Sequence, residues 1–233
     1  MKRASVILTI GWAMMAIFLG ILPAAAEALE ITSPYYCLID AETGQVILGK
    51  NCNTIRPVAS TTKMMTAILA AEYCDLNETA VVSKKADYTP EYTIGLREGQ
   101  KIALKELVKI ALIRSANDAA VAIAEHVAGD EELFGYLMSK KAFLIGAVNT
   151  RFVNASGLPD PRHYSTAYDL AQIGRYLLTK PYLSQTVASS VSEFQHPGYR
   201  KPLTINNTNR LLESFPGANG IKTGTTDAAG HCL

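Results

Sequence analysis

The chain lacks the compositional extremes that mark specialised classes of protein. Only 18% of its 233 residues are charged, the formal net charge is +1, and neither sign of charge forms a long run. A balance this close to neutral predicts no strong attraction to nucleic acid. Internal repeats and low-complexity segments are also absent. With 48% hydrophobic residues, a chain of this length can bury a sizeable core.

Cysteine and histidine are scarce, and neither shows a metal-binding spacing. The four cysteines are too widely separated for a zinc motif or a redox pair: Cys37, Cys52, Cys74 and Cys232. The four histidines are equally scattered: His126, His163, His196 and His231. We therefore expect no metal and no cofactor, and a structural role for His126, which falls within a predicted helix. Disulfide pairing in an exported chain and free buried thiols are both open alternatives.

The N-terminus has the three regions of a secretory signal. Lys2 and Arg3 precede an uncharged apolar run over Ala4–Leu22, and Ala24–Ala26 provide the small residues that a signal peptidase requires. We predict a signal peptide over residues 1–26 and an extracytoplasmic location: the outer face of the cytoplasmic membrane, the periplasm or the cell wall. The alternative is an uncleaved membrane anchor, because the run approaches the roughly 20 residues that span a bilayer.

The most informative segment is Ser60-Thr61-Thr62-Lys63. Pro57 and the apolar residues around this segment predict a largely buried helix that begins near Ser60. Unpaired N–H groups and the helix dipole can stabilise an oxyanion beside a serine in the first turn. Lys63 follows one turn later, where burial and a neighbouring positive charge can lower its pKa enough to accept the serine proton. An isolated Ser-x-x-Lys is more typical of a helix cap and a surface lysine.

Two further motifs favour the catalytic interpretation. Ser115 and Asn117 fall on a tight turn between two predicted helices, where a hydroxyl can pass a proton and an amide can bind a peptide backbone. Lys222, Thr223 and Gly224 fall in a predicted strand, where an ammonium and hydroxyls can bind a carboxylate and the glycine leaves room for a ligand. Taken alone, the first of these two motifs is more typical of a helix cap, and the second of a plain edge strand with a solvated lysine. The ordered trio indicates a serine acyl-transferase site.

From about Pro34 to its last residue, the chain resembles the serine-type D-alanyl-D-alanine carboxypeptidases, the low-molecular-mass penicillin-binding proteins of bacteria. The trio of motifs carries this resemblance, because nearly the same set is typical of penicillin-binding proteins and class A β-lactamases. The segments around the first two motifs, Arg56–Thr66 and Ser115–Ala120, match the family as well. Weaker matches lie at Leu38–Ala41, Phe152–Leu158 and His163–Ala171.

The resemblance implies removal of the terminal D-alanine from peptidoglycan stem peptides through an acyl-enzyme. Ser60 would be the nucleophile, Lys63 the general base and Ser115 the proton shuttle. The substrate-binding residues would be Asn117, Lys222, Thr223, Gly224 and Thr225. The backbone N–H groups of Ser60 and Thr225 would form the oxyanion hole. β-Lactam antibiotics would acylate Ser60, and transpeptidation is the nearest alternative, because an amine can intercept the same acyl-enzyme.

Two departures from the family pattern affect the expected activity. No glutamate occurs between Glu132 and Glu193, the region where a class A β-lactamase places its deacylating glutamate, so we expect penicillin to leave slowly. The chain also ends nine residues after Gly224, whereas the family continues with further strands and a helix. We therefore expect a catalytic domain over 27–233 that is incomplete at its C-terminus, with weak activity or none. The competing hypothesis is an inactive truncated remnant that only binds peptidoglycan.

The hydrophobic pattern predicts a mixed α/β chain of the α+β type. Two segments, Tyr35–Ile39 and Gln45–Leu48, flank a turn and predict a β-hairpin, and Ile221–Thr226 predicts a strand. Helices are predicted over 60–71, 101–113, 118–128, 130–145 and 166–179. The last of these has an approximate capping box formed by Thr166 and Asp169, and Pro181 is expected to end it. The resemblance implies a β-lactamase/transpeptidase-like fold. In that fold an antiparallel sheet is flanked by helices, and the site lies between the sheet and a mostly helical subdomain.

Overall fold

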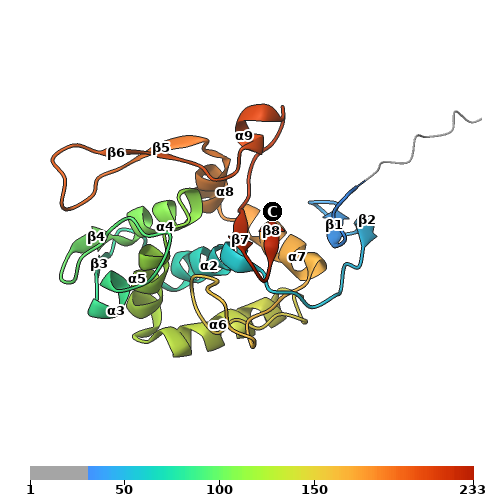
Figure 1. Cartoon of the computed structure of the whole chain (residues 1–233), viewed down its shortest axis with the longest axis horizontal. Coiled ribbons are helices and arrows are strands. Elements are labelled where there is room, and N and C mark those ends of the chain that lie inside the picture. Colours follow the sequence, from blue (N-terminus) through green and yellow to red (C-terminus); the bar gives the residue numbers. More distant parts are fainter. Residues whose placement is uncertain (1–30) are drawn as a thin grey trace, which may run out of the picture. The chain divides into compact units, whose positions relative to one another are not determined.

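A computed structural model describes residues 31–233 of the chain (Figure 1). The chain divides into two compact units, Met1–Pro34 and Tyr35–Leu233, and every helix and strand described below belongs to the second. The signal peptide predicted over residues 1–26 lies outside the described residues. Among the helices that are described, none combines the length and the apolar character needed to cross a membrane.

Short antiparallel strand pairs alternate with helices along the second unit. The strands are β1 (Tyr36–Ile39), β2 (Val46–Lys50), β3 (Thr79–Val81), β4 (Lys101–Ala103), β5 (Val191–Phe194), β6 (Leu203–Asn206), β7 (Gly224–Thr226) and β8 (Gly230–Cys232). The helices are the 3₁₀ turn η1 (Ala59–Thr62), α2 (Lys63–Tyr73), α3 (Lys84–Asp87), α4 (Leu104–Ile113), α5 (Asn117–Ala128), α6 (Glu131–Leu144), α7 (Ala167–Leu178), α8 (Pro181–Ala188) and α9 (Leu211–Ser214). The predicted mixture of helices and antiparallel strands is confirmed.

Each strand pairs with its sequence neighbour, so the described strands form four two-stranded sheets: β1–β2, β3–β4, β5–β6 and β7–β8. The hairpin predicted near the start of the unit is confirmed as β1–β2. Its turn is closed by the Asp40 N–H, which donates to the Gln45 carbonyl at 2.8 Å, and by the Asp40 carboxylate, which accepts the Thr43 N–H at 2.7 Å. An aspartate that binds the backbone two or three residues ahead is a common way to start a turn.

The core lies among α2, α4 and α5, which contact one another pairwise (Figure 1). Lys63–Ala70 of α2 and Asn117–Ala124 of α5 are buried without interruption. A helix that is apolar on most sides must be surrounded by other elements. The alanines of α2 and α5 allow neighbouring helices to approach closely. This packing brings the first turns of α2 and α5, which contain two of the three motifs, against each other.

Two predicted helices begin differently in the structure. Lys101–Ala103 are strand β4 rather than helix, because they pair with Thr79–Val81, and the helix begins only at Leu104. The helix predicted from Ser60 begins with the 3₁₀ turn η1 and becomes α-helical at Lys63. The predicted cap of α7 is confirmed, since the Thr166 hydroxyl accepts the Asp169 N–H at 3.0 Å.

The remaining differences lie in short elements. The strand predicted over Ile221–Thr226 is limited to Gly224–Thr226, where β8 supplies hydrogen-bond partners. Pro181 ends the preceding helix as predicted and also begins α8, which was not predicted; its fixed φ suits the first turn of a helix.

The four cysteines are free, and each is partly exposed.

Candidate active site

The sharp turn η1 presents Ser60 beside Lys63. Ala59 has a φ of +48°, a left-handed value that turns the chain just before the serine. Three residues later, the Lys63 Nζ lies 2.9 Å from the Ser60 Oγ. Side chains three residues apart on a helical turn lie on the same face, which explains this contact. The predicted nucleophile and base are therefore within hydrogen-bonding distance.

The Lys63 amine is completely buried and has three polar neighbours. Besides the Ser60 Oγ, it lies 2.7 Å from the Asn117 Oδ1 and 2.7 Å from the Ser156 carbonyl oxygen. Burial lowers the pKa of Lys63 well below its usual range, and the positive charge of Lys222 lowers it further. The negative charge of Asp118 acts in the opposite direction. The net result favours the neutral amine.

A neutral amine fits these three neighbours. Asn117 Oδ1 and the Ser156 carbonyl can only accept hydrogen bonds, so they use both N–H groups of the neutral Lys63. The remaining lone pair of the nitrogen then points to Ser60 and can accept the hydroxyl proton. The arrangement therefore orients Lys63 as a base toward Ser60 before any substrate arrives.

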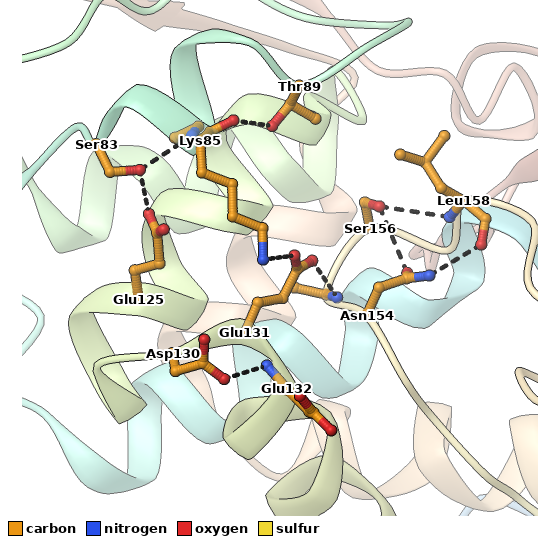
Figure 2. Close-up of polar contacts among 12 residues, drawn as sticks. Ser83, Lys85, Thr89, Glu125, Asp130, Glu131, Glu132, Asn154, Ser156 and Leu158 are labelled. Atoms are coloured by element: carbon orange, nitrogen blue, oxygen red, sulfur yellow. Dashed lines mark hydrogen bonds and ion pairs between the residues drawn. The ribbon is translucent and has the colours of Figure 1, made fainter.

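A tight turn over residues 154–158 holds the Ser156 carbonyl in place (Figure 2). The Asn154 Nδ2 donates to the Leu158 carbonyl at 2.9 Å, and the Leu158 N–H donates to the Ser156 hydroxyl at 3.3 Å. Figure 2 also shows Glu131, whose carboxylate accepts from the Ala155 N–H at 3.1 Å and pairs with Lys85 at 2.8 Å. This turn is thus tied to the start of α6.

A second support lies beneath η1. The His163 Nδ1 accepts the Val153 N–H at 3.3 Å, so its Nε2 must carry the proton that it shares with the Thr62 hydroxyl at 2.8 Å. The Thr62 hydroxyl in turn donates to the Ala59 carbonyl at 2.7 Å. Burial lowers the pKa of His163 to about 4, which keeps the ring neutral. This chain of contacts fixes the turn that contains Ser60.

Asn117 is directed inward. In addition to its contact with Lys63, its Nδ2 donates to the carbonyls of Glu91 at 3.2 Å and Pro90 at 3.3 Å, and its backbone N–H donates to the Tyr92 carbonyl at 3.0 Å. The side chain is buried, with 3% of its surface exposed. To bind a substrate backbone, the Asn117 amide would have to give up its hydrogen bond to one of these carbonyls. Its predicted role in substrate binding therefore stays a prediction.

Ser115 occupies the predicted turn between α4 and α5. Its φ of +67° is left-handed, which is unusual for a residue other than glycine and is typical of functional turns. Only 8% of its surface is exposed, and it lines the same cavity as Ser60. The predicted proton shuttle and the predicted nucleophile therefore line one cavity.

The third motif approaches Ser60 from β7. A Cβ added to Gly224 would lie 2.7 Å from the backbone nitrogen of Ser60 and 3.0 Å from that of Thr61. We expected this glycine to leave room for a ligand; the structure shows that it leaves room for the backbone of η1. The close approach brings β7 alongside Ser60, as the positions of β7 and α2 in Figure 1 illustrate.

Lys222 precedes β7 and is almost completely buried, with 2% of its surface exposed. Its Nζ donates to the Thr223 carbonyl at 2.7 Å, and burial lowers its pKa to about 7. The Thr223 hydroxyl donates to the Thr208 hydroxyl at 2.7 Å, and the Thr225 hydroxyl lies 3.1 Å from the His231 Nδ1. All members of the motif therefore lie at or just below the wall of the cavity.

The cavity has a volume of about 450 Å³, within the range typical of small-molecule sites. Its lining residues are Ser60, Tyr92, Ser115, Thr208, Arg210, Thr223, Gly224, Thr225, His231 and Cys232. Most of the predicted site residues are among them, whereas Lys63, Asn117 and Lys222 lie behind the lining. Arg210 adds a permanent positive charge that suits a carboxylate.

Sequence reasoning missed several residues that build this site. Ser156 contributes through its backbone carbonyl, a group that every residue has, so its side chain gave no signal beyond its place in a family-like segment. Asp118 accepts hydrogen bonds from the N–H groups of Ile94, Gly95 and Leu96 at 3.1 Å each. Tyr92 and Arg210 come from loops distant in sequence from all three motifs.

Comparisons with known proteins identify the family. A family described as D-alanyl-D-alanine carboxypeptidase matches residues 23–233. The D-alanyl-D-alanine carboxypeptidase DacF of Bacillus subtilis (strain 168) is 37% identical over 201 residues, covering 84% of this chain and 51% of that protein. A D-alanyl-D-alanine carboxypeptidase structure from Mycobacterium tuberculosis H37Rv is 32% identical with a TM-score of 0.81, covering 88% of this chain and 79% of the other.

Penicillin-Binding Protein D2 from Listeria monocytogenes, solved in its ampicillin-bound form, is 27% identical with a TM-score of 0.76, covering 88% of this chain and 84% of the other. The chain belongs to the D-alanyl-D-alanine carboxypeptidase family. The predicted β-lactamase/transpeptidase-like fold class is confirmed by these structures. The chain spans between 51% and 66% of the length of the first curated relatives that it matches.

Proposed function

We propose that the protein is a serine-type D-alanyl-D-alanine carboxypeptidase that removes the terminal D-alanine from peptidoglycan stem peptides. The observation that carries this proposal is the buried Lys63 amine, whose Nζ lies 2.9 Å from the Ser60 Oγ and donates to the Asn117 Oδ1 and to the Ser156 carbonyl. Membership of the D-alanyl-D-alanine carboxypeptidase family supports the choice of substrate. The catalytic domain extends over residues 27–233, after the signal peptide.

Acylation begins when Ser60 attacks the carbonyl carbon between the two D-alanines. The Ser60 hydroxyl proton passes to the Lys63 nitrogen as the Oγ–C bond forms, and the carbonyl oxygen becomes an oxyanion. The backbone N–H groups of Ser60 and Thr225 stabilise this oxyanion, which is consistent with the close approach of β7 to the Ser60 backbone at Gly224. Collapse of the intermediate breaks the C–N bond, and Ser115 passes a proton to the departing D-alanine nitrogen.

Deacylation reverses these roles. Lys63, neutral again, accepts a proton from a water molecule that attacks the acyl carbon, and the Ser60 Oγ leaves with a proton. Asn117 positions the backbone of the peptide, and the terminal carboxylate is bound by Lys222, Thr223 and Thr225. Gly224 allows the strand to reach this position. The segment 133–192 lacks a glutamate that could activate water against a β-lactam ester, so penicillin remains attached for longer than the peptide.

The signal peptide over residues 1–26 directs the protein out of the cytoplasm. Stem peptides are accessible outside the cytoplasmic membrane. β-Lactams are inhibitors because they occupy the cavity as the D-alanyl-D-alanine end does, and the ampicillin-bound structure of the similar Listeria protein supports this. Neither nucleic acid nor a cofactor takes part in the reaction.

The test is to incubate the purified protein with a fluorescent penicillin and with a peptide ending in D-alanyl-D-alanine, with Ser60→Ala as the control. We expect covalent label on a denaturing gel and slow release of one D-alanine per peptide, both absent from Ser60→Ala. Folded protein that takes up no label would contradict the proposal. Adding an acceptor amine separates hydrolysis from transpeptidation, because transfer would yield a longer peptide.

A further inference from the structure

Three potential metal ligands from two separate parts of the chain lie together outside the active site. The Cys74 Sγ, a carboxylate oxygen of Glu78 and a ring nitrogen of His126 all lie within 4.8 Å of one another. The Glu78 Oε2 is 3.0 Å from the His126 Nε2. We propose that these three side chains bind one zinc ion, with water as the fourth ligand.

The cluster is remote from the reaction chemistry. Cys74 directly follows α2, and His126 lies in the last turn of α5. At 1.5 Å per residue, they lie about 16 Å and about 14 Å along their helices from Lys63 and Asn117. Both helices direct their C-terminal ends to this place. Because the C-terminal end of a helix has a partial negative charge, two such ends together favour a cation.

The chemistry of the three ligands selects the metal. A thiolate, an imidazole and a carboxylate are the three side-chain groups that bind zinc, and three protein ligands with one water complete a tetrahedron. Calcium and magnesium prefer oxygen ligands and bind sulfur poorly. Zinc bonds of about 2.0–2.3 Å place tetrahedral ligands about 3.3–3.8 Å apart. The spread within 4.8 Å therefore needs only small side-chain rotations.

The loop between Cys74 and Glu78 is firmly held. The Glu78 Oε1 accepts the Asp75 N–H at 2.9 Å, which leaves the Oε2 directed to His126. The Glu78 carbonyl accepts the Leu104 N–H at 2.8 Å, so the loop is fastened to the start of α4. Hydrogen bonds that orient a ligating carboxylate are typical of metal sites. The ligands are thus presented by ordered backbone rather than by a free surface loop.

Metal binding would change the protonation of the site. Cysteine binds zinc as its thiolate, so the Cys74 thiol must lose its proton. As the sulfur–zinc bond forms, the S–H bond breaks and the proton passes to solvent. The His126 Nε2–H, which donates to the Glu78 Oε2 in the metal-free protein, also loses its proton, either to solvent or by transfer to Nδ1, and the freed lone pair then binds zinc. The partly exposed Glu78, whose side chain is 48% accessible, leaves a path for the ion and for the fourth ligand.

The competing account is a structural one. Without metal, His126 and Glu78 form a partly exposed hydrogen bond beside the Cys74 thiol, and such a contact contributes little to stability. That account predicts no stoichiometric metal binding. Zinc at this site would instead join the far ends of the two helices that supply Lys63 and Asn117. The site would stabilise the helical core without taking part in the proposed reaction.

The test is titration of the metal-free full chain with Co²⁺, which replaces zinc and absorbs light. We expect one equivalent to bind, with the near-ultraviolet thiolate-to-cobalt band and visible bands of tetrahedral cobalt, and zinc to displace it. We also expect zinc to raise the midpoint of thermal unfolding. A folded wild-type chain that develops no thiolate band overturns the proposal.

Three variants locate the ion. Cys74→Ser should abolish the thiolate band, His126→Gln should weaken zinc binding at least tenfold, and Cys52→Ser, a second partly exposed cysteine, should change neither. An unchanged band in Cys74→Ser, or its loss in Cys52→Ser alone, places the ion elsewhere and overturns the proposal. If Cys74→Ser fails to fold, the test depends on His126→Gln. An unchanged affinity of His126→Gln for zinc would then overturn the proposal.

Discussion

The site contains two buried lysines that are held in different ways. Lys63 lies among α2, α5 and the turn at 154–158, where its amine has three polar neighbours from three separate segments. Lys222 donates to the carbonyl of the next residue, at the entrance to a two-stranded hairpin of three-residue strands. Burial lowers the pKa of both, well below the usual range for Lys63 and to about 7 for Lys222.

The difference separates two tasks. A base must keep one orientation toward one atom, and contacts with three segments provide that. A carboxylate-binding lysine needs charge, which a ligand can restore by raising the amine's pKa when it binds. The helical side of the site is therefore prearranged, whereas the β7 side depends on the short hairpin and on its contact with η1. Four predictions test this comparison.

The largest expected effect comes from the helical side. Lys63→Met removes the base and leaves the Asn117 Oδ1 and the Ser156 carbonyl without their donor. We expect the rate of penicillin labelling to fall about 10³-fold and the free energy of unfolding to fall by about 1–3 kcal/mol. The labelling rate is measured from samples quenched at successive times, and the free energy of unfolding from urea titration.

The matched control is Lys141→Met, which removes another partly buried lysine, one that pairs with Glu72 at 2.7 Å. Lys141→Met should lower the free energy of unfolding and leave the labelling rate unchanged. A folded Lys63→Met that labels within tenfold of the wild type would show that Lys63 is not the base.

The second prediction breaks the contact on the β7 side. Gly224→Ala places a Cβ 2.7 Å from the Ser60 nitrogen, where backbone on both sides must move. A displacement near 1 Å in a catalytic arrangement costs about 10²-fold in rate, so we expect labelling to slow by that factor. Gly99→Ala is the control for backbone strain away from Ser60, because Gly99 has a φ of +81° but its added Cβ meets nothing within 4 Å. Equal rates in both variants would mean that β7 does not need to touch Ser60.

The third prediction concerns the support beneath η1. The pKa of His163 is about 4 in the folded protein and near 6.5 when unfolded, so the unfolded chain binds more protons between these values. Stability should therefore fall as the pH falls from about 6.5 to about 4, by about 3 kcal/mol in total. Urea unfolding across this range measures it. His163→Gln cannot titrate, so its stability should lack the part of the pH dependence that comes from His163. A pH dependence of stability identical to that of the wild type would contradict the assignment of this fall to His163.

The smallest effect connects the two lysines. The charge of Lys222 lowers the pKa of Lys63, so Lys222→Met should raise that pKa and move the acid limb of the labelling profile to higher pH. Because Lys222 itself has a pKa of about 7, its influence is greatest below that pH. The pH of half-maximal rate is the quantity to compare, since carboxylate binding changes the amplitude as well. An unmoved acid limb would mean that the two amines act independently.

Local sequence patterns predicted much of the fold and the position of the nucleophile. The Thr166 cap, the turn after Ile39 and the helix near Ser60 depend on residues within a few positions of one another, and all were found. Lys101–Ala103 were predicted as helix because their own pattern continues into α4. Their strand conformation depends on Thr79–Val81, about twenty residues earlier, which no local pattern contains.

The order of residues along the chain by itself determined the family and the choice of Ser60, Lys63 and Ser115 as the proposed catalytic residues. Ser60 and Lys63 lie one turn apart wherever that segment forms a helical turn. Only the tertiary structure decided that the Ser156 carbonyl and Asn117 use both N–H groups of Lys63, that Gly224 makes room for Ser60 rather than for a ligand, and that Cys74 meets His126. These contacts join residues distant in sequence, and burial, which lowers the pKa of both lysines, exists only once the chain has packed.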